Sequence, residues 1–171
     1  MINGKPTRVT DTEELIAAAG RALDRIAPAV DRRVAELNRY RDTLASRVAT
    51  ALDMPSRRTA EGLSLASEVR AYIKAMKQPA ARAKFVMDAI GAGDLPTVAA
   101  VLHAPFFLCG LDPAMHATLR ARAAATFAPV DSSQLEAADA AIVQVTNAGS
   151  AIVKRLGGVI AFRNAPVAKA S

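Results

Sequence analysis

The sequence has few of the residues that form disulfides, aromatic cores or membrane spans. Of its 171 residues one is cysteine and none is tryptophan, and aromatic residues make up 4%. A single cysteine, Cys109, excludes an internal disulfide, and a chain of this length can bury a sufficient core without one. The uncharged stretch 95–111 is shorter than the roughly 20 residues of a transmembrane helix. It is also broken by Pro96, Pro105 and Gly110, so we expect no membrane span.

Patterns typical of β-strands are also scarce. Runs of β-branched or aromatic residues that alternate with polar ones are hard to find, whereas alanine is abundant. Alanine favours the helix because it loses no side-chain entropy there. We therefore predict an all-α fold, a bundle of about five to six helices with a long kinked N-terminal helix and an extended C-terminal arm.

The first predicted helix covers residues 11–53. Thr10 and Glu13 form a capping-box pattern at its start. Unbroken, this helix would span about 65 Å, whereas a compact chain of this length is only about 40 Å across. We expect a kink at Pro28 with helix beyond it, leaving part of an apolar stripe for partners. The stripe recurs every seven residues, at Ile16, Leu23, Val30, Leu37, Leu44 and Ala51.

Five further helices are predicted from proline, glycine and N-capping residues at their boundaries. The last is expected to be capped by Ser132 or Ser133 and to end at Gly157-Gly158, with an arm over 159–171. We accordingly divide the chain into a helical domain, 1–130, and a C-terminal helix plus docking arm, 131–171. The other four helices are expected at about 56–77, 79–91, 95–104 and 113–127, followed by a linker at Ala128-Pro129.

Residues 103–116, HAPFFLCGLDPAMH, concentrate both histidines, the cysteine and an aspartate. A metal site would use His103, Cys109, Asp112 and His116, but close ligand pairs typical of structural zinc sites are missing. A nucleophilic Cys109 with His116 would need a base and an orienting group, which the sequence does not show. We interpret the stretch as a structural corner, with a reactive site at His103, Cys109 and His116 as the alternative. The residues expected to fill the groove between the adjoining helices are Phe106, Phe107, Leu108 and Leu111.

The net charge of +6 allows contact with a polyanion. The candidate phosphate-contact residues are two basic pairs, Arg57-Arg58 and Arg120-x-Arg122. No helix-turn-helix signature or interleaved aromatic residues accompany these pairs. A solvated basic surface is therefore our main interpretation, and nucleic-acid binding is possible but not favoured. A DNA-associated accessory protein, acting in packaging or ejection, is the alternative function.

One sequence pattern lies in segment 66–127, mainly in FVMDAIGAGDLPTVAAVLHAPFFLCGLDPAMHATLRAR. It consists of an AGD triplet, a short predicted helix, the spaced residues AP-F-L-GL, and then another predicted helix. This pattern resembles uncharacterised helical proteins from the structural gene blocks of tailed bacteriophages and prophages. The resemblance implies a virion or virion-assembly protein, made in the bacterial host cytoplasm and located in the virion. It implies no catalytic residue.

The polar start MINGKPTRVT lacks the apolar centre of a signal peptide, so we expect no export by that route.

Together these observations predict a non-enzymatic structural protein that works through protein–protein contacts in a symmetric oligomer. Its partners are expected to be other virion proteins and copies of itself. We predict no catalytic, cofactor-binding or metal-binding residue. The candidate partner-contact residues lie on the first helix and the arm: Leu37, Leu44, Val48, Val159, Ile160 and Phe162.

Overall fold

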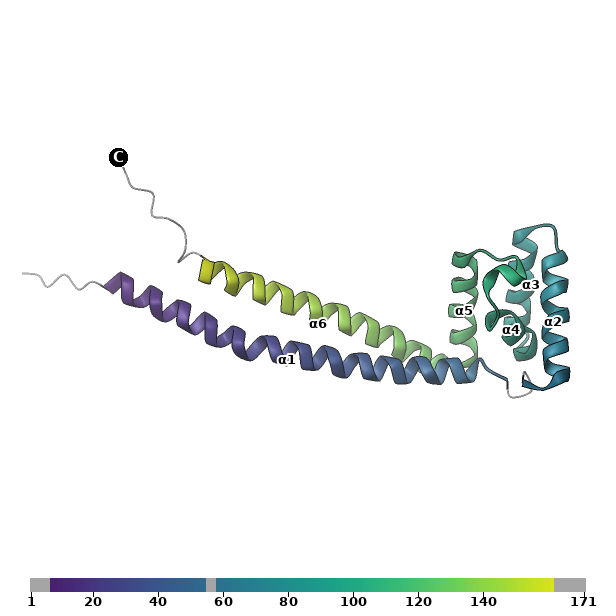
Figure 1. Ribbon diagram of the computed structural model, residues 1–171, viewed down its shortest axis with the longest axis horizontal. Coiled ribbons are helices and arrows are strands. Elements are labelled where there is room, and N and C mark those ends of the chain that lie inside the picture. The colour runs from purple at the N-terminus through teal and green to yellow at the C-terminus, as the bar shows by residue number, and fades with distance from the viewer. Residues whose placement is uncertain (1–6, 55–57, 162–171) are drawn as a thin grey trace, which may run out of the picture. The chain divides into compact units, whose positions relative to one another are not determined.

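The computed structural model describes residues 7–54 and 58–161, and this part of the chain is helical without strands. Within these residues there are six α-helices, with one short 3-10 helix between the fourth and fifth (Figure 1). The all-α prediction is therefore confirmed. In chain order the elements are α1 (Thr7–Ala51), α2 (Ala60–Ala75), α3 (Pro79–Gly91), α4 (Leu95–Leu102), η2 (Phe106–Cys109), α5 (Pro113–Phe127) and α6 (Pro129–Ala161).

The chain forms two compact units. The two-helix unit contains the chain up to Tyr40 and from Ala138 onward, and the core unit contains Arg41–Ala137. Both long helices, α1 and α6, therefore contribute residues to each unit. The boundary expected at 130/131 lies inside α6, whose first turns belong to the core unit.

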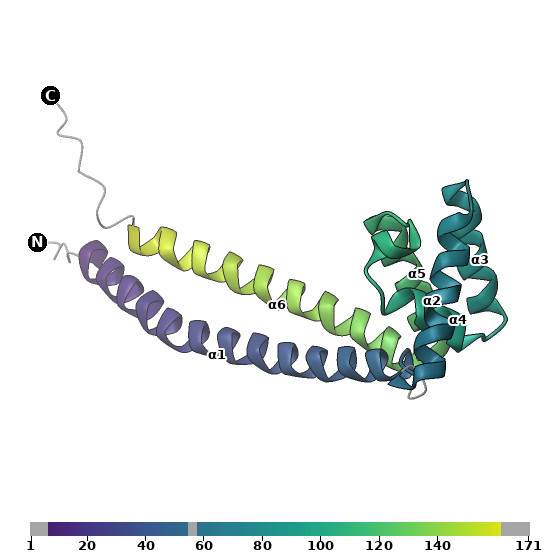
Figure 2. The same ribbon diagram turned by 45° about the vertical axis from the view of Figure 1, so that its right-hand side comes forward.

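Helix α1 runs from Thr7 to Ala51 with Pro28 inside it. It begins before the predicted capping box at Thr10 and is about 68 Å long at 1.5 Å per residue. Pro28 cannot donate a hydrogen bond to the preceding turn, yet the chain stays helical and α1 curves gently (Figures 1 and 2). This confirms a long N-terminal helix that continues beyond the proline, whereas the kink expected at Pro28 is not seen and α1 bends gradually instead.

Helix α6 extends past both of its predicted ends. It begins at Pro129, which suits a first helical position because the N–H groups there have no partner within the helix. Ser132 therefore lies in the first turn and does not cap it. The helix also passes through Gly157-Gly158 to Ala161, since glycine tolerates helical backbone angles at modest cost. The first three residues of the predicted arm are thus helical, and residues 162–171 lie outside the described part.

The shorter helices follow local signals more closely. The Asp94 carboxylate accepts a hydrogen bond from the Thr97 N–H at 3.2 Å, and Asp112 accepts one from the Met115 N–H at 2.7 Å. These N-caps start α4 and α5 at the predicted places. Gly110 adopts a left-handed conformation, with φ of 62°, at the end of η2.

Helix α2 starts later than predicted. Its N-cap is Thr59, whose hydroxyl accepts a hydrogen bond from the Gly62 N–H at 3.1 Å. The helix therefore begins at Ala60 and not near residue 56.

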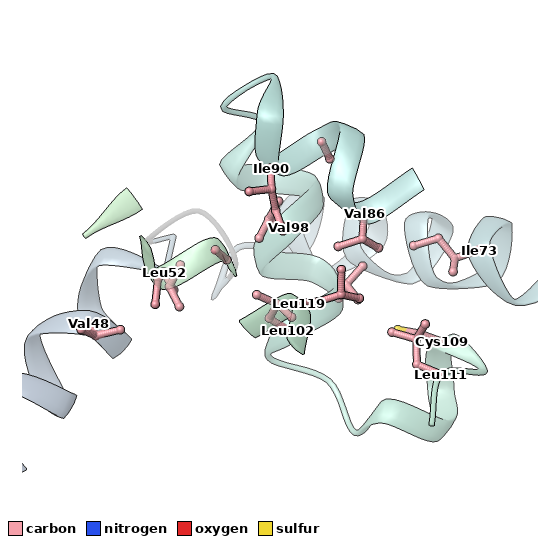
Figure 3. Packing of buried hydrophobic residues seen from close by; sticks show 14 of the residues in the cluster. Val48, Leu52, Ile73, Val86, Ile90, Val98, Leu102, Cys109, Leu111 and Leu119 are labelled. Atoms are coloured by element: carbon pink, nitrogen blue, oxygen red, sulfur yellow. The ribbon is translucent and has the colours of Figure 1, made fainter. Parts of the chain in front are cut away.

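The core unit encloses one apolar cluster (Figure 3). Val48 of α1 belongs to this cluster and is 8% exposed, and Leu44 of α1 is also buried, with 0% of its surface exposed. Their candidate role as partner contacts is therefore corrected, because the chain itself covers this end of the stripe. The labelled members of the cluster are Val48, Leu52, Ile73, Val86, Ile90, Val98, Leu102, Cys109, Leu111 and Leu119.

Arg82 of α3 connects three segments of the core unit. Its Nη2 and Nε atoms donate to the Met76 carbonyl oxygen at 2.7 and 3.0 Å, and Nη1 donates to the Gly110 carbonyl oxygen. Met76 is the C-cap of α2, where carbonyl groups lack partners within the helix and a cation is favoured. The guanidinium thus joins the end of α2 to the turn after η2.

We predict that Arg82→Ala lowers the free energy of unfolding by about 2 kcal/mol, because partly buried carbonyls lose a charged donor. Urea denaturation measures this change. Lys84→Ala is the matched control on the same helix, since the Lys84–Asp88 pair is exposed and contributes at most about 0.5 kcal/mol. Equal losses in both variants would contradict this role for Arg82.

Candidate functional site

The corner over residues 103–116 buries its cysteine. Cys109 is 0% exposed and lies in the apolar cluster (Figure 3). Burial raises the pKa of the Cys109 thiol, and the positive charge of Arg70 offsets part of this rise. A raised pKa favours the protonated thiol, whereas the thiolate is the reactive nucleophile. Cys109 therefore serves as a small apolar core residue, as the structural-corner interpretation predicts.

His103 connects two helix ends in the core unit. Its Nε2 atom lies 2.9 Å from the Leu52 carbonyl oxygen and 3.7 Å from Oδ1 of Asp53. A carbonyl only accepts hydrogen bonds, so Nε2 carries the proton in this contact. His103 follows α4 and Leu52 follows α1, so the contact holds these ends together.

His116 lies on α5 and is half-buried. Its Nε2 atom is buried and has no hydrogen-bond partner among the described residues. Burial lowers the pKa of His116, the positive charge of Arg120 lowers it further, and the carbonyls of Val101 and Leu102 offset part of this. The neutral imidazole is therefore favoured in the folded chain.

These placements give the corner a structural role. Asp112 is occupied as the N-cap of α5, and Cys109 is enclosed, so a substrate has no access to the thiol. Among residues 7–54 and 58–161, no three His, Cys, Asp or Glu side chains form a group that could hold a metal ion. The geometry therefore offers no support for the alternative of a reactive site at His103, Cys109 and His116.

One expectation for the corner is wrong. Phe106, Phe107 and Leu108 are 38%, 60% and 41% exposed, and only Leu111 of the four residues expected in the groove is buried. The short helix η2 places Cys109 in the core and leaves the three residues before it outside. Phe106 and Phe107 instead pack edge to face, with ring centroids 5.9 Å apart.

We predict that the Cys109 thiol of the native protein reacts with a disulfide reagent at least about a hundredfold more slowly than in urea, because reaction requires local opening. Absorbance of the released thiolate measures both rates in one sample. Similar native and unfolded rates would show that Cys109 is accessible.

The two-helix unit carries an apolar groove on its surface. There α1 and α6 run antiparallel, side by side (Figures 1 and 2), and border a groove of about 640 Å³. Within α1 its lining includes Ala27, Asp31, Val34 and Asn38, whose spacing of four, three and four is typical of residues that face another helix. The full lining is Ile26, Ala27, Val30, Asp31, Val34, Ala35 and Asn38 of α1 with Thr146, Gly149, Ser150, Val153 and Lys154 of α6.

Gly149 allows the two helices to approach each other in this groove. A Cβ atom at Gly149 would lie 2.7 Å from Cγ1 of Val30, closer than carbon atoms pack. The absence of a side chain at Gly149 therefore makes room for Val30. Glycine is needed at this position for packing and not for its backbone conformation.

The two-helix unit encloses little apolar surface of its own. In its described part the buried apolar side chains are two alanines, Ala19 and Ala138. Larger side chains are half-buried, as at Leu23 and Leu37, or exposed. The exposed ones are Leu15 at 60%, Tyr40 at 48%, Val143 at 58%, Ile152 at 37% and Val153 at 45%.

The predicted partner contacts are only partly described. Leu37 and Ile160 are half-buried in the two-helix unit, consistent with a surface that a partner could cover. The side chain of Val159 and all of Phe162 lie outside the described part.

The described members of the predicted phosphate-contact set do not form one continuous basic surface. Arg58 is exposed and lies 3.7 Å from Asp53, whereas Arg57 lies outside the described residues. Arg120 and Arg122 are exposed on α5. Residues two apart on a helix point to different sides, so these two do not act as a pair.

The groove was not predicted from the sequence, although α6 carries a signal for it. Residues 140–153 of α6 contain no charged side chain, in a chain that is 22% charged. A helix without charge on any face is typical of a buried position. No helix of the described part is long and apolar enough to cross a bilayer, so this stretch does not indicate a membrane span.

Comparison of the chain with protein-family models, with curated proteins and with solved structures found no match.

Proposed function

We propose that this protein is a non-enzymatic structural component of a bacteriophage virion or of virion assembly. It works through protein–protein contacts in a symmetric oligomer. The observation that carries this proposal is the small core of the two-helix unit, in whose described part the only buried apolar side chains are Ala19 and Ala138. Such a surface is stabilised when further helices cover it.

Energetic reasoning supports contacts at this surface. Full burial of a Leu, Ile or Val side chain contributes about 1.5 to 3 kcal/mol, whereas ordering each residue costs about 1 to 2 kcal/mol of backbone entropy. Two packed helices share one seam, and apolar side chains beside that seam stay half-exposed. Leu23, Ile26 and Leu37 are in this position. Additional helices would bury them and stabilise both α1 and α6.

The uncharged stretch of α6 supports the same proposal. Val143, Ile152 and Val153 are all at least 37% exposed within residues 140–153. These three side chains point to different sides of α6, as expected of a helix that more than one neighbour covers. The partners on this proposal are copies of the same chain and other virion proteins.

The assignment to a virion rests on the resemblance of segment 66–127 to helical proteins of tailed-phage structural gene blocks. The residues of that segment that could have suggested chemistry have structural roles instead. They cap helices, fill the core or form a turn: Asp94, Cys109, Gly110 and Asp112.

The alternative of a DNA-associated protein has less support from the charges. Residues 8–39 of α1 carry equal numbers of basic and acidic side chains, so the net charge of this stretch is zero and it adds nothing to the basic surplus that would attract a polyanion. The basic ones are Arg8, Arg21, Arg25, Arg32, Arg33 and Arg39, and the acidic ones are Asp11, Glu13, Glu14, Asp24, Asp31 and Glu36.

We predict that the purified full chain forms an oligomer, with a mass by light scattering that is a multiple of the 17.9 kDa of one chain. The expected cause is association of exposed apolar helices. Mass is measured over a range of concentrations at moderate salt. A single chain at every concentration would contradict the proposed symmetric oligomer.

A further inference from the structure

We infer that the groove between α1 and α6 receives the two-helix unit of a second copy, so that two chains form one intermolecular four-helix bundle. This inference rests on the proposed function and names the partner and the contact surface. The occupant is a second copy of this chain.

The shape of the groove fits helices as its occupant. Its lining extends along α1 from Ile26 to Asn38, a rise of about 18 Å. Over this length α1 presents Ile26, Val30 and Val34 at four-residue intervals, while α6 presents Val153. Apolar residues at such spacing form the core layers of helical bundles. A helix laid along the groove would contact both walls.

The charges of the groove favour a second copy over a strongly charged partner. One acidic and one basic side chain line it, Asp31 on α1 and Lys154 on α6. A twofold axis brings the same pair from the other chain, so each carboxylate has an ammonium group available and no net charge is buried. A basic or acidic partner would leave Asp31 or Lys154 without a counter-charge.

The available area is also sufficient for a dimer. A stable interface buries about 800 Å² on each partner. The face of the two-helix unit extends about 40 Å along α1 from Glu13 to Tyr40 and is two helices, or about 20 Å, wide, which gives an area on the order of 800 Å². Pairing along this whole face would cover Leu23, Leu37 and the groove together.

Polar residues in the lining can define the alignment of the two chains. Asn38, Thr146 and Ser150 lie in the groove among apolar side chains. Polar groups in a helical interface favour registers in which they meet one another, because other registers bury them without partners.

The test compares Val153→Glu with Ala151→Glu by sedimentation of the full chain. Val153 lines the groove, whereas Ala151 is two residues away on another side of α6 and is exposed. The two variants add the same charge to the same helix turn. We expect Val153→Glu to weaken association at least about a hundredfold, because unpaired carboxylates would be buried. Ala151→Glu is expected to associate like the parent.

Folding is monitored independently in both variants. Val153 is 45% exposed in the single chain, so its replacement does not remove a core residue. An unchanged unfolding midpoint for the core unit confirms that loss of mass reflects lost association.

The outcomes separate the inference from the proposed function. If the parent is an oligomer and Val153→Glu has the same mass, the groove is not the contact surface and the inference is overturned, while protein–protein assembly stands. A parent that sediments as a single chain overturns the second-copy inference together with the symmetric oligomer.

Discussion

Two helices packed only against each other bury a single seam, and this limit governs the two-helix unit. Its apolar side chains extend beyond that seam, so Leu23 and Leu37 stay half-buried and Val143 stays exposed. The core unit does not have this limit. There helices from several directions enclose Leu52, Ile73 and Leu119 almost completely. One chain thus combines a unit that covers its own core with a unit whose apolar face is available to neighbours, and the proposed assembly role follows from that contrast.

The predictions from sequence were most accurate where short-range chemistry determines the structure. Asp94 and Asp112 cap α4 and α5 as expected, because an aspartate accepts hydrogen bonds from N–H groups two or three residues ahead. The end of α6 was not predicted, since Gly157 and Gly158 are compatible with both a helix and its termination. The heptad stripe of α1 was recognised, but it does not specify which neighbour covers it. Leu44 is covered by the chain itself, whereas Leu37 remains partly open.

The candidate site shows the same difference between local and distant information. Cys109 was correctly placed in a structural corner, but the outward direction of Phe106 and Phe107 depends on a 3-10 turn that the residues alone did not indicate. The groove combines Val30 with Gly149, which are far apart in the sequence. Such a surface cannot be assembled from periodicity in one helix. The uncharged stretch 140–153 of α6 indicated that this helix packs against neighbours, but not which residues of α1 lie opposite it.

Amide hydrogen exchange at two protein concentrations tests most directly whether the two-helix unit depends on neighbours. The account predicts that dilution to single chains speeds exchange in α1 up to Tyr40 and in α6 from Ala138 by at least about tenfold, because these helices lose their covering partners. Amides around Ile73 and Leu119 in the core unit should keep their protection. Equal protection of both units in the single chain would show that the two-helix unit is stable by itself and would contradict the account.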